Sequence, residues 1–152
     1  MFRNKKAFTL IELMITAVIL TLVLGGLLQL FAYCLNLAEI STNLTLVVSE
    51  VQGKLEEIRN HDFSDIADHY GASGGHGDSF PLDQLNGTAV IYINNSNSQL
   101  LAIEIAASWA TSRNQVVGED KNLNGALDAG EDDNGNGKLD SPATVTTLLA
   151  KR

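Results

Sequence analysis

The stretch that decides the fold reads KKAFTLIE at residues 5–12 and continues from Leu13 to Ala38 without a charged residue. At a rise of about 1.5 Å per residue, this charge-free run forms a helix about 39 Å long, and about twenty apolar residues already span a bilayer. An ionised Glu12 near the start of such a helix is costly unless a cation meets it. The stretch therefore predicts a transmembrane helix over residues 8–36 that holds one carboxylate.

The charges around this helix predict its orientation. Arg3, Lys5 and Lys6 precede the apolar run, and no comparable basic cluster follows it closely. Because basic residues concentrate on the cytoplasmic side, we expect residues 1–7 in the cytoplasm and the rest of the chain outside. A secretory signal peptide also starts with basic residues, but its cleavage site follows a shorter apolar core, and nothing in this sequence is typical of that site.

KKAFTLIE closely resembles the processing site of type IV prepilins and type II secretion pseudopilins, and the resemblance extends from residue 5 to about residue 35. It implies that a prepilin peptidase on the cytoplasmic face cuts between Ala7 and Phe8 and that residues 1–7 are a leader peptide. Phe8 then becomes the N-methylated terminus, and Glu12 becomes the fifth mature residue. The family usually has Gly where this chain has Ala7, so we expect slower processing, although a small residue is kept.

The same resemblance implies a role for Glu12 in a filament of stacked apolar helices. A buried carboxylate needs a partner, and the family supplies the free amine of a neighbouring subunit's first residue, which sets the axial register. The alternative is a simple signal anchor in which Glu12 reaches the lipid headgroups. As a filament subunit, the chain has as partners other pilin or pseudopilin subunits, the prepilin peptidase, an inner-membrane assembly platform and the lipid bilayer.

Composition limits what the rest of the chain can be. The 152 residues carry a net charge of −8, which becomes −11 without the leader. About 90 residues remain for a soluble head, enough for one small domain, and its acidic character argues against nucleic-acid binding. Cys34 is the only cysteine, so no intramolecular disulfide can form. The sequence has no GxSxG, no catalytic cysteine outside the membrane and no zinc motif, so we expect no enzyme activity.

Beyond the membrane stretch, apolar residues recur at steps of three and four, the period of a helix with one buried face. They are Leu37, Ile40, Leu44, Val47, Val51, Leu55 and Ile58. The helix is therefore expected to continue over residues 37–60. Glycine and polar residues then predict a long connecting loop over residues 61–87. His61, His69 and His76 lie in or beside this loop without a spacing typical of metal ligands, and we expect them to be solvated.

The remaining apolar segments predict strands. Residues 88–93 and 100–109 are rich in Val, Ile, Leu and aromatic residues, and residues 94–98 between them supply turn chemistry, so an antiparallel hairpin is expected. Residues 145–149 suggest a third strand, and Trp109 is expected in the core or at a sheet edge. The predicted fold class is α+β, a long amino-terminal helix packed on a small antiparallel sheet within residues 61–152. This arrangement resembles the pilin head.

Residues 120–140 carry a calcium-loop pattern between the second and third predicted strands. Oxygen ligands stand at the first, third, fifth, ninth and twelfth positions, Gly125 stands at the sixth, and a main-chain carbonyl is available at the seventh. The ligands are Asp120, Asn122, Asn124, Ala126 through its carbonyl, Asp128 and Glu131. Seven carboxylates against two lysines in residues 119–140 would repel one another without a cation. We therefore predict one Ca²⁺ here; the alternative is an acidic, solvated loop.

The pattern recurs twelve residues later, where a second Ca²⁺ is an open alternative. The corresponding residues are Asp132, Asn134, Asn136, Lys138 and Asp140. Ala143 stands where the closing Glu would be, so this copy is incomplete unless Asp133 or Glu131 is shared between two ions. No long amphipathic helices flank the loops, so they are not a helix-loop-helix EF-hand pair. Calcium is expected to order the segment and to pin the adjoining strands.

These features together predict a structural minor pilin or pseudopilin subunit. It would leave the inner membrane for a type IV pilus or a type II secretion pseudopilus, with its head periplasmic or extracellular. The short head and the helix ending KLEEIR at residues 54–59 resemble minor rather than major subunits. A subunit of a DNA-uptake filament is an alternative within this class. Outside the class, the alternative is a membrane-anchored calcium-binding module or adhesin that is never polymerised.

Overall fold

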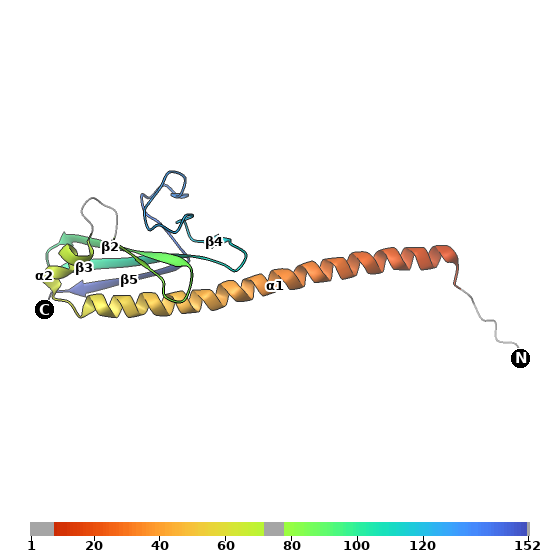
Figure 1. The fold of residues 1–152 in the computed structure, drawn as a ribbon, viewed down its shortest axis with the longest axis horizontal. Coiled ribbons are helices and arrows are strands. Elements are labelled where there is room, and N and C mark those ends of the chain that lie inside the picture. The colour runs from red at the N-terminus through yellow and green to blue at the C-terminus, as the bar shows by residue number, and fades with distance from the viewer. Residues whose placement is uncertain (1–7, 72–77, 152) are drawn as a thin grey trace, which may run out of the picture. The chain divides into compact units, whose positions relative to one another are not determined.

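The computed structural model of the chain describes residues 8–71 and 78–151 (Figure 1). The chain divides into two compact units between Glu39 and Ile40. This boundary falls inside the long helix α1 (Leu10–Arg59), which contributes to both units. The predicted leader with Ala7 lies outside the described residues, and so does the predicted loop histidine His76.

The first unit, from Phe8 onward, consists of the apolar part of α1. Every side chain from Phe8 to Leu35 is exposed. The helix begins directly after Thr9, whose Oγ1 accepts the Glu12 N–H at 3.4 Å. Thr-x-x-Glu is the sequence of a capping box, in which a hydroxyl side chain satisfies one of the free N–H groups at the start of a helix. Glu12 therefore lies in the first turn, where the helix dipole favours a negative charge.

In the second unit, α1 buries one face, as its sequence period predicts. Val47, Val51, Leu55 and Ile58 are buried, and Ile40 and Leu44 pack against them as partly buried neighbours. Leu37, the first residue of the predicted stripe, is 46% exposed and belongs to the other unit. The buried face of α1 therefore begins about one turn later than the apolar period of the sequence suggests.

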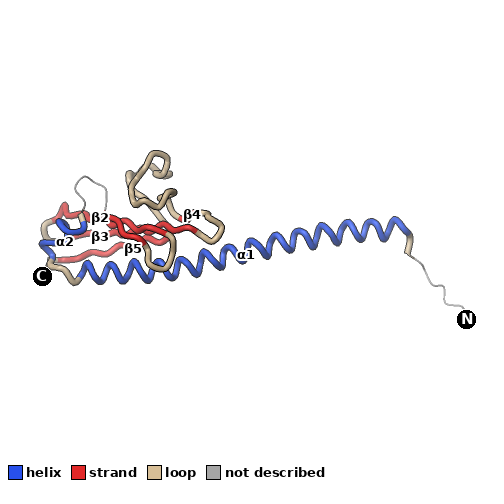
Figure 2. The backbone as a smooth tube through the Cα atoms, in the orientation of Figure 1, coloured by secondary structure: helices blue, strands red, loops and turns tan. Residues whose placement is uncertain are grey.

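A five-stranded antiparallel sheet packs with α1 in this core (Figure 2). Its strands are β1 (Asp78–Pro81), β2 (Gly87–Asn97), β3 (Leu100–Ala110), β4 (Val116–Val117) and β5 (Ala143–Ala150). β3 is central, because it pairs with β2 along one edge and with both β4 and β5 along the other. β1 pairs with the outer edge of β2. The predicted α+β class is confirmed.

The two faces of the sheet follow from the alternation of side chains along each strand. On β3, Leu101, Ile103 and Ile105 belong to the core cluster that includes the buried face of α1. Trp109 on the same face is fully buried, so it takes the core position, one of the two positions expected for it. Residues at the alternate positions of β2 and β3 face the opposite side of the sheet, where the segment between β4 and β5 lies (Figure 1).

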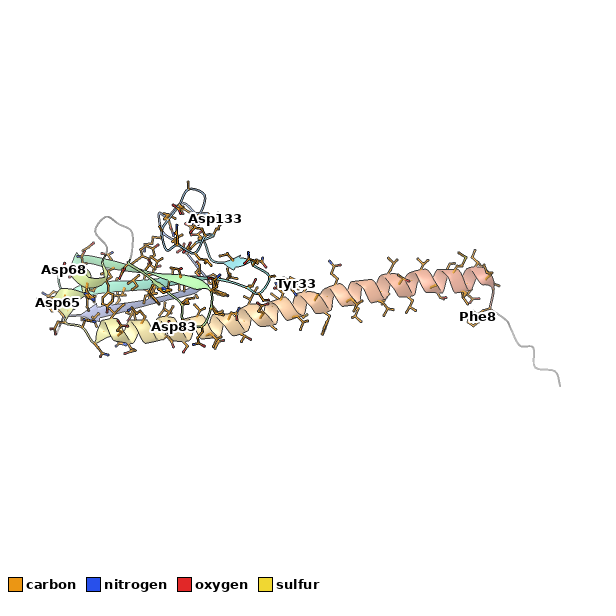
Figure 3. The ribbon with its side chains drawn as sticks, viewed as in Figure 1. Phe8, Tyr33, Asp65, Asp68, Asp83 and Asp133 are labelled. Atoms are coloured by element: carbon orange, nitrogen blue, oxygen red, sulfur yellow. The ribbon has the colours of Figure 1, made fainter. Side chains whose placement is uncertain are left out.

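The loop predicted over residues 61–87 is wrong in part, because it contains two short elements. Helix α2 (Phe63–Tyr70) buries Ile66 and Tyr70, and β1 extends the sheet. An element of eight residues or fewer covers barely two turns of a helix. It contains too few apolar residues for a period to be recognised in the sequence. His69 accordingly lies on α2 rather than in a loop, and Asp65 and Asp68 lie on the same helix (Figure 3).

The predicted strand bounds also need correction. β2 runs on to Asn97 with a register shift between Asn94 and Asn97, so the tight turn is shorter than the predicted residues 94–98. The two-residue strand β4 was not predicted, and β5 extends beyond residues 145–149 at both ends. Backbone pairing across a neighbouring strand decides these ends, and a single segment of sequence does not reveal it.

Candidate functional site

The predicted assembly residue Glu12 stands exposed in the first turn of α1. Phe8, the expected mature terminus, is 77% exposed (Figure 3). In the part of the chain that the structure describes, the ion pairs do not include Glu12. α1 also contains an eighteen-residue window with a mean hydropathy of 2.4, long and apolar enough to cross a membrane. The geometry leaves the Glu12 carboxylate available to a partner outside the monomer.

Asp120 organises the first predicted calcium loop although its side chain is only 1% exposed. Its Oδ1 accepts the Asn124 N–H at 3.1 Å, and its Oδ2 accepts the Gly125 N–H at 2.8 Å. Hydrogen bonds from backbone N–H groups satisfy a carboxylate without neutralising its charge. The first position of the loop is therefore a buried negative group around which the chain turns.

The two asparagines of the first loop point back to Asp128. Asn122 Nδ2 and Asn124 Nδ2 each donate to Asp128 Oδ2 at 2.8 Å. These two amide donors lower the pKa of the Asp128 carboxyl below its ordinary value. The Asn122 and Asn124 Oδ1 atoms accept the N–H groups of Asn124 and Ala126, at 3.0 and 2.7 Å. The Asn122 and Asn124 side chains thus both turn toward Asp128.

Glu131 closes the first loop from its twelfth position. Its Oε1 accepts the N–H groups of Lys121 and Asn122, at 2.9 and 3.3 Å. Its Oε2 accepts the Asp128 N–H at 3.0 Å, and the side chain is only 4% exposed. The carboxylate therefore ties the second, third and ninth positions of the loop together.

The second loop repeats the hydrogen bonds of the first loop with an offset of twelve residues. Asp132 accepts the Asn136 and Gly137 N–H groups, as Asp120 accepts those of Asn124 and Gly125. Asn134 Nδ2 and Asn136 Nδ2 both donate to Asp140 Oδ2, which stands where Asp128 stands in the first loop. Gly125 and Gly137 have nearly the same positive φ, 75° and 77°. The sequence repeat is thus also a structural repeat.

Specific contacts fix both loops to the sheet face opposite α1. Thr88 Oγ1 on β2 donates to the Leu123 carbonyl at 2.6 Å, and Leu139 N–H donates to the Tyr92 hydroxyl at 2.8 Å. Lys138 Nζ lies 2.6 Å from Glu104 Oε2 on β3. Burial raises the pKa of the Tyr92 hydroxyl, so Tyr92 stays protonated at neutral pH. The loops are a packed layer on the sheet rather than a free insertion.

The donor set of the first loop fits a hard cation in its chemistry. Carboxylate, amide and carbonyl oxygens are the ligands that Ca²⁺ takes, and each carboxylate or amide oxygen that accepts one N–H keeps a second lone pair. Within residues 8–71 and 78–151, however, no three Asp, Glu, His or Cys side chains converge closely enough to form a metal-holding group. A cation bound here would therefore have to replace the hydrogen bonds from the Asn122 and Asn124 amides to Asp128. It would then be bound by the oxygen atoms of these side chains.

Two side chains of the second loop, those of Lys138 and Asp133, form ion pairs instead of pointing into a loop. Lys138 directs its ammonium group to Glu104, so only its main-chain carbonyl could serve as a ligand, as predicted for Ala126. Asp133 forms an ion pair with Lys121 at 3.0 Å and stands on the outside of the segment (Figure 3). It therefore does not lie in a ligand position of either loop. Glu119, which the sequence pattern missed, accepts two backbone N–H groups of the second loop.

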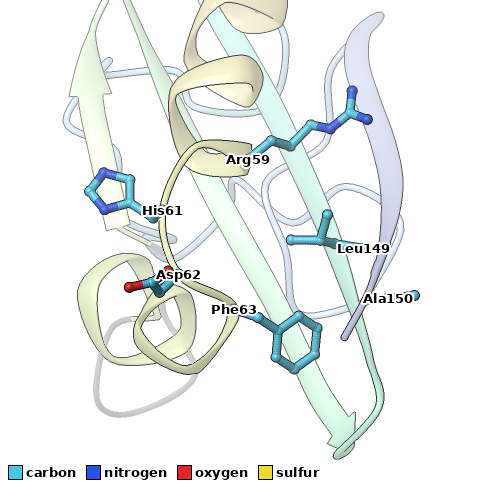
Figure 4. A pocket seen from close by; sticks show the side chains of 6 residues that line it. All are labelled: Arg59, His61, Asp62, Phe63, Leu149 and Ala150. Atoms are coloured by element: carbon cyan, nitrogen blue, oxygen red, sulfur yellow. The ribbon is translucent and has the colours of Figure 1, made fainter. Parts of the chain in front are cut away.

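His61 and His69 form a separate small cluster with Tyr70. The His61 and His69 rings stack with their centroids 5.3 Å apart, and Tyr70 meets both rings edge-on. Both histidines are exposed, which agrees with the expectation that they are solvated. A pocket of about 360 Å³ lies nearby (Figure 4). Its lining residues are Arg59, His61, Asp62, Phe63, Leu149 and Ala150.

Comparison with known proteins identifies the amino-terminal part of the chain. A family model described as the prokaryotic N-terminal methylation motif matches residues 2–28. No curated protein and no solved structure matches the chain. The matched residues include KKAFTLIE and the first part of α1, with Glu12 in its first turn. The chain therefore carries the motif that is the hallmark of type IV pilin and pseudopilin precursors.

Proposed function

We propose that the chain is a minor pilin or pseudopilin subunit that the prepilin peptidase cuts between Ala7 and Phe8. Its amino-terminal helix would then assemble with other subunits into a type IV pilus or a type II secretion pseudopilus. The methylation motif over residues 2–28 is the observation that carries this proposal, because the motif belongs to precursors of such subunits. Its position at the start of a membrane-length helix supports the same function.

The exposed apolar surface of α1 explains why such a subunit needs the lipid bilayer before assembly and neighbouring subunits after it. All side chains from Phe8 to Leu35 are exposed, and most of them are apolar. Proteins that remain monomeric in water rarely expose large continuous apolar patches. Before assembly the lipid bilayer covers this surface, with the amino terminus in the cytoplasm. After assembly the apolar helices of neighbouring subunits cover it.

Glu12 gives this assembly a register. An unpaired carboxylate in an apolar core costs several kcal/mol. An arrangement in which a neighbouring helix places a cation beside Glu12 is therefore favoured over one in which that helix is shifted along the filament axis. Cleavage before Phe8 creates a new amine four residues from Glu12 in the sequence. A free amine at the first residue of a neighbouring copy is therefore the complementary charge that the assembly itself supplies.

Calcium binding by the head is the second part of the proposal. The loops place Asp120 and Glu131 in buried positions, and both accept only backbone N–H groups among the described hydrogen bonds. Buried carboxylates favour a nearby positive charge. A Ca²⁺ in the first loop would supply that charge and hold the loop layer on the sheet. The head would then be stable in the calcium-containing medium outside the cytoplasm.

Mass spectrometry of the amino terminus of the protein from its native cells tests this function. We expect a chain that starts at N-methylated Phe8, and we expect Ala7→Gly to increase the fraction that is cut. A chain that keeps Met1 and an unmethylated leader would contradict the proposal. That result would favour the membrane-anchored calcium-binding module, which needs no processing.

A further inference from the structure

Glu119 occupies the place at the second loop that Glu131 occupies at the first. Glu119 Oε1 accepts the Asp133 N–H at 3.2 Å, and its Oε2 accepts the Asp140 N–H at 2.9 Å. Asp133 and Asp140 are the second and ninth residues of the second loop. Glu131 accepts the N–H groups of the second and ninth residues of the first loop in the same way, one with each oxygen.

The backbone N–H groups of Glu119 and Glu131 also form equivalent hydrogen bonds. Glu131 N–H donates to the Asp128 carbonyl at 3.2 Å, and Glu119 N–H donates to the Asp140 carbonyl at 2.9 Å. Each glutamate thus donates to the ninth residue of its loop and accepts from it. Glu119 directly precedes Asp120, just as Glu131 directly precedes Asp132. Each closing glutamate therefore stands immediately before the first aspartate of the other loop.

Ala143 cannot supply the missing carboxylate, for a structural reason. It stands at the twelfth position of the second loop, but it is already the first residue of β5 and pairs with Ala107. Its side chain is 1% exposed and belongs to the apolar core. A glutamate at this position would bury its charge beside the core, at a high cost in free energy. The chain enters the sheet too early for the second loop to close from its own end.

We propose that Glu119 is the closing ligand of the second loop, so that the two loops share their closing residues reciprocally and bind two calcium ions as one unit. This inference rests on the calcium binding proposed above. The complete second donor set would be Asp132, Asn134, Asn136, the Lys138 carbonyl, Asp140 and Glu119. Because Glu119 and Asp120 are neighbours, an ion in the second loop also orders the start of the first loop. Binding at the two loops should therefore be coupled.

The number of calcium ions bound by the full chain in detergent tests this proposal. Equilibrium dialysis with radioactive calcium should give two ions for the wild type and one for Glu119→Gln. We expect a loss of affinity of about tenfold or more at the second loop, since even partners that only orient metal ligands contribute about 10- to 100-fold. Asp133→Asn is the matched control. It removes a negative charge from the same segment at a position that closes neither loop, and it should still bind two ions.

Two further variants assign the lost ion to a loop. Glu131→Gln should remove the ion of the first loop, whereas Asp132→Asn combined with Glu119→Gln should remove no more calcium than Glu119→Gln alone. Hydrogen exchange without calcium should be faster at the Asp133 and Asp140 amides in Glu119→Ala and unchanged at the Lys121 amide. This readout shows that the variant still folds and that its effect is local.

The outcomes separate this inference from the proposed function. Two ions retained by Glu119→Gln with wild-type affinity would overturn the role of Glu119 and leave calcium binding intact. A wild type that binds one ion, lost only in Glu131→Gln, would also overturn it. A wild type that binds no calcium would overturn both the calcium part of the proposed function and this inference. A loss of one ion in Glu119→Gln, with two kept in Asp133→Asn, would support it.

Discussion

Gly125 shows how a single residue meets two requirements at once. Its φ of +75° lies in the left-handed region, and a Cβ added there would lie 2.5 Å from Ser79 Cβ and 3.0 Å from Thr88 Cγ2. The sixth position of the loop therefore needs glycine for its turn and also for close contact with β1 and β2. Gly135 has the same φ, but open space surrounds it. A comparison of substitutions at these two glycines therefore distinguishes the cost of the left-handed backbone from the cost of lost packing on the sheet.

We predict that Gly125→Ala destabilises the head more than Gly135→Ala. Both substitutions place a side chain in the left-handed region, at a cost of about 1–2 kcal/mol each. Only Gly125→Ala also forces the first loop away from Ser79. Urea unfolding measures the two differences in free energy. Equal losses of stability would show that the loop is not packed on the sheet as the structure has it.

Among the elements, long periodic segments were predictable from sequence and short ones were not. The apolar period predicted α1, and segments rich in Val, Ile, Leu and aromatic residues predicted most of β2 and β3. α2, β1 and β4 were missed, because each is too short to show a period and depends on contacts with distant residues. Pairing with β3, for example, is what makes Val116 and Val117 a strand.

The candidate site divides in the same way. The spacing of oxygen side chains predicted which residues organise the two loops, since that information is local. Glu119 could not be predicted, because it lies outside the twelve-residue pattern of the loop that it closes and meets Asp140 only through the fold. The contacts of the loops with Thr88 and Tyr92 are also long-range, and no sequence spacing records them.

The buried face of α1 makes a prediction at the scale of the element. Ile58 is fully buried in the core, whereas Leu37 has the same place in the apolar period and is 46% exposed. Ile58→Ala should destabilise the head by about 2–5 kcal/mol, because it removes a buried side chain and leaves a cavity. Leu37→Ala is the control and should change the free energy of unfolding of the head little. Thermal unfolding of both variants measures this, and similar losses would contradict the boundary at Glu39.

At the scale of the whole molecule, the two units have different stabilising environments. The first unit exposes apolar side chains that lipid or neighbouring subunits must cover. The second unit has its own core, covered on one side of the sheet by α1 and on the other by the paired loops. The head therefore contains what it needs to fold before assembly, and the loop layer is the part of it that calcium would reinforce.

We predict that calcium stabilises the head against heat. A ligand that binds only the folded state adds about 2.7 kcal/mol at a concentration one hundred times its Kd. The melting temperature of a head that lacks residues 1–35 should therefore rise in millimolar calcium and fall in chelator. Magnesium is the control, since it prefers a smaller octahedral site and keeps its waters. An unchanged melting temperature in calcium would exclude a structural ion.

Incorporation of Glu12 variants into filaments tests the assembly itself. Glu12→Ala and Glu12→Gln remove the charge that we propose to pair with a neighbouring subunit's amine, but they leave the apolar helix long enough to insert. Both variants should be cut, reach the membrane fraction at the wild-type level and be absent from sheared filaments of cells that express the native assembly system. Gln29→Ala, a change of an uncharged polar residue on the same helix, should assemble normally. Filaments that contain either Glu12 variant at the wild-type level would show that this carboxylate does not join the subunits.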